Sequence, residues 1–136
     1  MTLPLIESHP EQLGGLDPTA IANCVDECLA CSRTCTGCAD ACLSERDPAS
    51  LVHCIRTDLD CADLCATTAR VLSRRTGTNG VLDALLRACE QACRTCADEC
   101  GRHAAHHRHC ALCEEACRSC ADACQQLSAH LVGTGK

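Results

Sequence analysis

The chain has 136 residues, a formal net charge of −6, 18 cysteines and no phenylalanine, tyrosine or tryptophan. The acidic charge argues against a nucleic-acid or anionic-membrane surface, and no apolar stretch approaches the roughly 18 residues that a membrane-spanning helix needs. The N-terminus, MTLPLIESHPEQLGG, lacks the basic start and continuous apolar run of a signal peptide. We therefore expect a cytoplasmic protein whose thiols stay reduced.

Turn signals divide the chain into four helical pieces. Asp17-Pro18 and Asp47-Pro48 each combine an N-cap residue with a proline at the first helical position. The turn TGTNG at 76–80 and the histidine-rich stretch after Gly101 mark the other two boundaries. These signals predict helices at about 18–45, 48–74, 79–102 and 105–131, between an N-terminal segment, 1–16, and a C-terminal tail, 132–136.

Cysteines recur within these helices at alternating steps of three and four residues. The run from Cys24 to Cys42 steps by 4, 3, 4, 3, 4, and the run from Cys110 to Cys124 steps by 3, 4, 3, 4. This is the a/d stripe of a heptad, in which thiol replaces the usual leucine. The pattern predicts an all-α fold, an antiparallel four-helix bundle with a cysteine-lined core.

The motif CADxC stands once on each predicted helix. Its cysteines take the d and a positions, its alanine takes e, where a small side chain lets helices approach, and its aspartate takes f on the outer face. The aspartates are Asp40, Asp63, Asp98 and Asp122. We expect these four carboxylates to serve solubility rather than metal binding.

A stripe of thiols can serve as small apolar filling, as disulfides or as a set of metal ligands. Filling is a poor use for oxidisable side chains, and cysteines three or four apart on a helix fit the disulfide dihedral badly. Thiolate softness narrows a metal to Cu(I), Zn(II) or iron–sulfur clusters. We favour Cu(I), because roughly one ion per cysteine would neutralise a buried tube of thiolates; a zinc-thiolate or iron–sulfur protein is the alternative.

All of the cysteines are candidate metal ligands, because no single one is distinguished as a nucleophile and we expect no enzyme. The predicted metal residues are Cys24, Cys28, Cys31, Cys35, Cys38, Cys42, Cys54, Cys61, Cys65, Cys89, Cys93, Cys96, Cys100, Cys110, Cys113, Cys117, Cys120 and Cys124. On the second helix Asp58 and Thr68 replace thiols in the stripe. For Asp58 we expect a hydrogen bond or salt bridge to a neighbouring helix rather than metal ligation.

Antiparallel packing predicts two unlike ends. One end gathers the histidines, and imidazole can pass Cu(I) to thiols by ligand exchange, so we expect metal entry there. His103, His106 and His107 continue the stripe and are the stronger candidates, whereas His109 flanks it; His9 and His130 lie elsewhere, on the surface. The other end is closed by Ile21, Leu72, Leu82, Leu86, Leu127 and Leu131.

The segments CVDECLACSRTCTGCADAC, CEQACRTCADEC and CALCEEACRSCADAC give the chain, from about Asp17 to Leu131, a resemblance to the bacterial copper storage proteins (Csp family), specifically to their cytosolic branch. The resemblance implies a four-helix bundle whose cysteines bind many Cu(I) ions. It also implies sequestration of cytosolic copper, which protects against its toxicity or keeps a supply, and assembly as a homotetramer.

Overall fold

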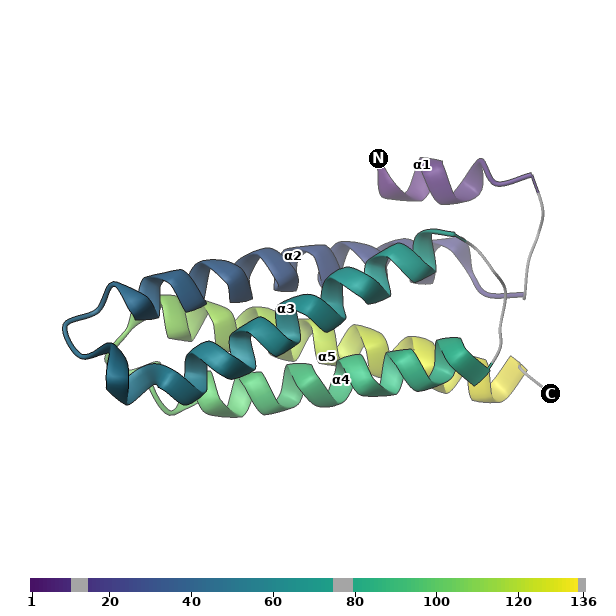
Figure 1. The fold of residues 1–136 in the computed structure, drawn as a ribbon. Coiled ribbons are helices and arrows are strands. Elements are labelled where there is room, and N and C mark those ends of the chain that lie inside the picture. Colours follow the sequence, from purple (N-terminus) through teal and green to yellow (C-terminus); the bar gives the residue numbers. More distant parts are fainter. Residues whose placement is uncertain (11–14, 75–79, 135–136) are drawn as a thin grey trace.

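Four long helices form an elongated antiparallel bundle (Figure 1). The structure is a computed structural model that describes residues 1–10, 15–74 and 80–134. Its elements are α1 (Thr2–Glu7), α2 (Pro18–Leu43), the 3-10 turn η1 (Pro48–Leu51), α3 (Val52–Ser73), α4 (Gly80–Gly101) and α5 (Arg108–Thr134). Within these described ranges there is no strand, and no helix is long and apolar enough to cross a membrane. The predicted fold class is confirmed.

The two Asp-Pro signals act differently. Asp17 caps α2, because its Oδ1 accepts a hydrogen bond from the backbone N–H of Thr19 at 3.2 Å. Asp47 makes no side-chain cap bond, and Pro48 opens a 3-10 turn before the α-helix begins at Val52. The predicted second helix therefore starts one turn late.

The connection between α4 and α5 also differs from the expectation. Residues 102–107 form successive turns, in which the backbone N–H groups of His106 and His107 donate to the carbonyl of His103. As a result α5 begins at Arg108 rather than near residue 105, and it continues to Thr134 rather than ending near 131. His103, His106 and His107 consequently leave the helical stripe on which they were expected.

The bundle interior consists of sulfur along most of its length and of aliphatic side chains at one end. All 18 cysteines are unpaired by disulfides, and none is more than 2% exposed. At the end opposite the histidine-rich turn at 102–109, the predicted apolar plug is buried: Ile21, Leu72, Leu82, Leu86, Leu127 and Leu131. The sulfur-lined part therefore has one end sealed by hydrocarbon.

The four CADxC motifs occupy the positions that the heptad assigned to them. Their alanines are at most 5% exposed, and their aspartates lie on the surface. Two of these aspartates form exposed ion pairs between α4 and α5, Asp98 with Arg118 at 3.5 Å and Asp122 with Arg94 at 3.4 Å. Because exposed pairs add little stability, the motif's structural contribution is the close helix contact at alanine.

The N-terminal segment contains a short helix, α1, that packs against α2. Ile6 is buried in this contact, and the Thr2 hydroxyl donates to Asp26 Oδ1 at 2.6 Å. Gly15 follows with φ +69°, a backbone conformation that side-chain-bearing residues rarely adopt. The segment 1–16 thus includes an additional packed element outside the four-helix bundle.

Candidate metal centre

Helices α2 and α5 face each other through a ladder of sulfur pairs. The pairing is antiparallel, and each rung joins a thiol of one helix to a thiol of the other. The Sγ–Sγ distances are 3.9 Å for Cys24–Cys124, 3.7 Å for Cys28–Cys120, 3.7 Å for Cys31–Cys117, 3.6 Å for Cys35–Cys113 and 3.9 Å for Cys38–Cys110. The heptad spacing on both helices produces this regular register.

Helices α3 and α4 form a second, shorter ladder. Its rungs are Cys54–Cys100 at 3.5 Å, Cys61–Cys93 at 3.6 Å and Cys65–Cys89 at 3.7 Å between Sγ atoms. The two ladders touch through Cys31–Cys61 at 3.8 Å and Cys65–Cys120 at 3.8 Å. The thiols therefore form one continuous array rather than separate sites.

Neighbouring sulfur groups in this array share members. Four-sulfur groups whose atoms all lie within 4.8 Å of one another include Cys31, Cys65, Cys93 and Cys120; Cys31, Cys35, Cys61 and Cys117; and Cys35, Cys96, Cys113 and Cys117. Cys31 belongs to the first two groups, and Cys35 and Cys117 to the last two. Shared sulfurs suit a cluster in which each thiolate bridges metal ions, whereas isolated tetrahedral zinc sites need four sulfurs of their own.

Burial opposes ionisation of every thiol in the array, whereas hydrogen bonds between the thiols shift individual pKa values in both directions. Removal from water raises the pKa of Cys42 to about 11, and burial likewise raises the pKa of Cys110. In the described part of the chain the buried charged side chains are both acidic, Asp58 and Glu99, so no lysine or arginine neutralises the interior. Metal ions would have to supply the positive charge for ionised sulfur.

Asp58 stands in the α3–α4 ladder where the regular register would place a thiol. It is fully buried, and its Oδ1 accepts hydrogen bonds from the thiols of Cys96 at 3.1 Å, Cys113 at 3.1 Å and Cys100 at 3.4 Å. Desolvation raises the pKa of Asp58 to about 9, so the carboxyl is neutral at pH 7. The expected hydrogen bonds to neighbouring helices are present.

Thr68 is the other residue that replaces a thiol on α3. It is fully buried, and its hydroxyl donates to the Leu64 carbonyl at 2.7 Å. The Thr68 hydroxyl is therefore hydrogen-bonded within its own helix and needs no partner in the sulfur array. Thr68 therefore ends the sulfur ladder beside the apolar plug.

Among the histidines, His109 contacts the sulfur array most directly. Its Nδ1 lies 3.3 Å from Cys38 Sγ, 3.6 Å from Cys110 Sγ and 4.0 Å from Cys42 Sγ. Burial by itself would lower the pKa of His109, but hydrogen bonds to Cys38 and Glu45 outweigh it and raise the pKa above its usual value. The heptad pattern placed His109 beside the stripe and made it the weaker entry candidate, whereas in the structure it is the histidine that contacts the sulfurs.

The other expected histidines lie outside this contact. His107 Nδ1 is 3.1 Å from Glu45 Oε2, and His103 Nε2 is 3.1 Å from Glu99 Oε2. His106 is exposed on the turn. These three histidines do not continue the stripe, because residues 102–107 turn instead of extending the α-helix and the stripe resumes only within α5.

The sequence reasoning missed two acidic residues at this end. Glu45 follows the last cysteine of α2 and contacts His107 and His109, whereas Glu99 is buried and contacts His103, Arg102 and, at 4.0 Å, His53. A carboxylate close to a histidine-rich turn was a usable signal, since such groups often orient imidazoles.

A model of the copper storage protein family, Csp, matches residues 17–129, which is most of the chain and all but the end of the bundle. The chain belongs to this family. Copper storage proteins of known structure resemble it closely. Ccsp from Streptomyces lividans loaded with 10 copper equivalents is 55% identical, with a TM-score of 0.92 over 95% of this chain and 98% of that one.

Two further solved structures of copper storage proteins have the same fold. A cytosolic copper storage protein from Streptomyces lividans holding five coppers is 58% identical, with a TM-score of 0.82 over 85% of this chain and 98% of that one. Apo-Csp3 from Bacillus subtilis is 31% identical, with a TM-score of 0.68 over 78% and 96%. These comparisons do not favour the zinc-thiolate and iron–sulfur alternatives.

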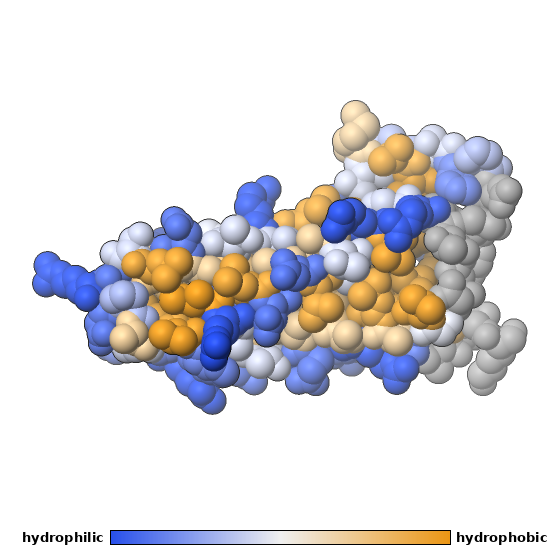
Figure 2. Space-filling model, viewed as in Figure 1, coloured by the Kyte–Doolittle hydropathy of each residue, from blue (hydrophilic) through white to orange (hydrophobic). Residues whose placement is uncertain are grey.

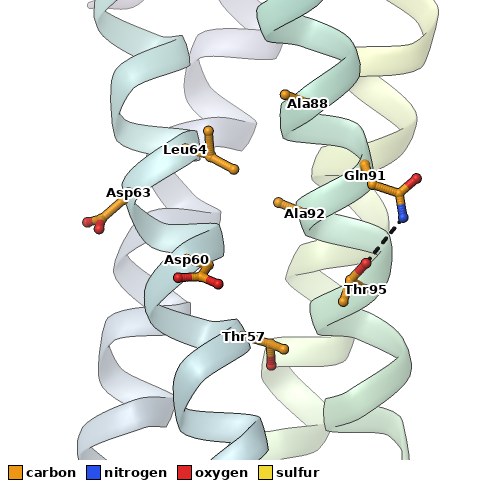
Figure 3. Close-up of a pocket in the computed structure, with 8 residues that line it drawn as sticks. All are labelled: Thr57, Asp60, Asp63, Leu64, Ala88, Gln91, Ala92 and Thr95. Carbon is orange, nitrogen blue, oxygen red and sulfur yellow. Dashed lines mark hydrogen bonds between the residues drawn. The ribbon is translucent and has the colours of Figure 1, made fainter.

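The outer surface of this family member contains a groove that is separate from the sulfur array. It lies between α3 and α4, has a volume of about 530 Å³, and is lined by Leu64, Ala88 and Ala92 beside the acidic Asp60 and Asp63 (Figure 3). The same flank of the molecule shows apolar surface interrupted by hydrophilic side chains (Figure 2). No cysteine lines the groove, so it is not part of the candidate metal centre.

Proposed function

We propose that this protein stores and sequesters Cu(I) in the cytosol, holding many ions on the thiolates inside its bundle and so protecting the cell against copper toxicity. The observation that carries the proposal is the continuous array of buried sulfurs, in which adjacent four-sulfur groups share members. All 18 cysteines act as ligands, at roughly one ion per cysteine, because this ratio makes the core neutral. Storage requires no catalytic step, and we assign none.

Loading exchanges protons for copper. Each thiol gives up its proton as Cu(I) bonds to the sulfur, and the proton leaves to solvent, so charge is conserved inside the bundle. No basic side chain within the described interior competes with the metal for thiolate. Because neighbouring sulfurs lie 3.5–4.0 Å apart within the ladders and between them, an ion held by one group can pass to the next by exchanging one ligand at a time.

Copper enters at the histidine end. His109 and the thiols of Cys38, Cys42 and Cys110 place one nitrogen and three sulfurs within 4.8 Å of one another, next to the turn between α4 and α5. His109 is about a quarter exposed, with 23% of its side chain accessible, whereas the three cysteines are buried. An imidazole that reaches both solvent and sulfur is suited to receive an ion and pass it inward. His103, His106 and His107 form the outer approach.

The proposal extends to location and assembly by family resemblance. The Streptomyces lividans relative is a cytosolic copper storage protein, which supports a cytoplasmic location for this chain. We propose a homotetramer on the same basis. Neither nucleic acid nor a membrane is a proposed partner.

An anaerobic Cu(I) titration of the reduced protein, against a competing chromophoric chelator, tests the proposal. We expect the protein to bind about 18 ions or more before the chelator colours, or roughly one per cysteine. Saturation at one to four ions would leave most of the thiols without a role and would overturn storage. A parallel titration with Zn(II) serves as the control for metal identity, and tighter retention of zinc than of Cu(I) would also contradict the proposal.

A further inference from the structure

Glu45 joins two histidines to the end of α2. Its Oε2 lies 2.8 Å from Nε2 of His109 and 3.1 Å from Nδ1 of His107, and the two imidazole rings stack with centroids 5.4 Å apart. The backbone N–H of Glu45 donates to the carbonyl of Cys42 at 3.2 Å. The backbone of Glu45 is therefore hydrogen-bonded to a cysteine at the histidine end of the sulfur array, which we call its mouth.

The opposite edge of His109 faces the sulfurs. Its Nδ1 lies 3.3 Å from Cys38 Sγ and 3.6 Å from Cys110 Sγ, while Nε2 points to Glu45. A neutral imidazole carries its proton on one nitrogen only, and a carboxylate can accept but not donate. A hydrogen bond from Nε2 to Glu45 thus requires the proton on Nε2 and leaves a lone pair on Nδ1.

We propose that Glu45 is a positioning residue for copper entry. It holds His109 with the proton on Nε2, so that the unprotonated Nδ1 faces the thiols of Cys38, Cys42 and Cys110. Carboxylate–histidine pairs of this kind fix ring orientation and raise the basicity of the metal-facing nitrogen. His107 buttresses the arrangement, because it contacts the same carboxylate oxygen and stacks on the His109 ring. The inference rests on the proposed function, since it names how the entry histidine is prepared.

A plain surface ion pair is the competing account. Glu45 is 32% exposed, and exposed pairs between a carboxylate and a cation usually contribute little. If Glu45 acted only through such a pair, its replacement would remove one negative charge and nothing else. Removing the charge of a neighbouring acidic residue would then slow copper entry to the same extent. Asp47 lies in the same turn, is exposed, and makes no side-chain cap bond. Asp47→Asn is therefore a matched control that removes the same charge without touching an imidazole.

The experiment compares the wild-type chain with Glu45→Gln and Asp47→Asn by two measurements. Long-range ¹H–¹⁵N spectra of the apo protein at mildly alkaline pH, with His109→Ala identifying the His109 signals, report which ring nitrogen carries the proton. Stopped-flow transfer of one Cu(I) equivalent from a chromophoric chelator reports the rate of entry. We expect Glu45→Gln to lower the population protonated on Nε2 and to slow entry by about 10–100-fold. Asp47→Asn should resemble wild type in both measurements.

Total copper capacity separates this inference from the storage proposal. Glu45→Gln should bind the same final number of ions as wild type, because no sulfur is lost and the change lies on the surface. Unchanged proton placement and an unchanged entry rate in Glu45→Gln would overturn the positioning role and leave storage standing. Equal slowing by Asp47→Asn would also overturn it, in favour of simple charge attraction. If the wild-type protein bound only a few ions, the storage proposal would be overturned. The spectra would still show which nitrogen of His109 carries the proton, and so would test the role of Glu45 separately.

Discussion

Asp58 Oδ1 lies 3.1 Å from Cys96 Sγ, at the one place in the described α3–α4 ladder where a carboxyl stands between two sulfur rungs. The same oxygen accepts a thiol hydrogen bond from α5, so three helices meet at this carboxyl. In the apo protein the α3–α4 ladder is thus interrupted at Asp58, whereas the α2–α5 ladder continues past it through Cys35–Cys113 and Cys31–Cys117. The Asp58 carboxyl occupies a position that the heptad pattern assigns to a cysteine. Burial raises its pKa and so keeps it protonated.

Asp58 should make the apo protein less stable as pH rises. Its pKa is about 9 in the folded chain against an ordinary value of 3.8, so between these limits the folded state holds a proton that the unfolded state has lost. The stabilisation is complete below about pH 4 and is lost as pH rises through about 9, by up to about 1.4 kcal/mol per pH unit. Chemical denaturation between pH 5 and 7.5 should show this slope in wild type and a flatter one in Asp58→Asn.

Asp60→Asn is the control for that slope. Asp60 lies on the same helix, is exposed, and carries the same charge. Its replacement should leave the pH dependence of the wild type unchanged. A slope that is identical in wild type, Asp58→Asn and Asp60→Asn would show that the buried carboxyl is already ionised at neutral pH.

Copper uptake should release about one proton for each thiol that becomes a ligand. The cause is burial, which opposes ionisation of every thiol in the array and, at Cys42, where it is the largest effect, raises the pKa to about 11. Filling the array in a weakly buffered solution at pH 7 should therefore release about 18 protons per chain, which a pH indicator can count. Release of only a few protons would mean that the apo core already contains many thiolates.

Replacing His109 should slow copper exchange without emptying the core. His109→Ala removes the one imidazole that contacts the described sulfurs, so we expect removal of copper by a strong chelator to slow by about tenfold or more. Total capacity should stay near one ion per cysteine. The measurement is the chelator's absorbance after mixing with loaded protein.

His106→Ala provides the comparison for His109→Ala, because His106 is exposed on the adjoining turn. It should exchange copper at close to the wild-type rate. Equal slowing in the two variants would indicate that the turn as a whole, rather than the imidazole beside the sulfurs, governs exchange. Replacing His103, His106 and His107 together then measures the contribution of the outer approach.

The apolar plug should contribute to stability and not to capacity. Leu86 is fully buried at the plug, and Leu86→Ala should destabilise the apo bundle by about 2–5 kcal/mol through lost burial and a cavity. Val81→Ala on the same helix, at a side chain 74% exposed, should change stability by about 0.5 kcal/mol at most. Denaturation of both variants, followed by a Cu(I) titration, checks the two expectations. A reduced copper capacity in Leu86→Ala would contradict the separation of the two ends.

Periodicity was sufficient to predict the bundle and the sulfur ladders, because a 3-4 repeat places every thiol on one face of its helix whatever the neighbouring sequence does. It was insufficient at the mouth. The orientation of His109 depends on the turns at 102–107, which interrupt the helix, and on Glu45, which approaches from the bend that follows α2. Contacts between distant segments have no periodic signal. The start of α3 at Val52 was missed for a similar reason, since Asp47 has capping chemistry but its side chain makes no cap bond.

The sealing of one end by leucine and isoleucine makes the array a dead-end channel. An ion beside Cys24 and Cys124, next to the plug, has no exit of its own and must follow the ions nearer to Cys38 and Cys110. Copper that entered first would then leave last, as in a stack. A copper ion next to the plug would therefore stay bound longer than one near Cys38 and Cys110, because of its depth in the array and not because its ligands differ.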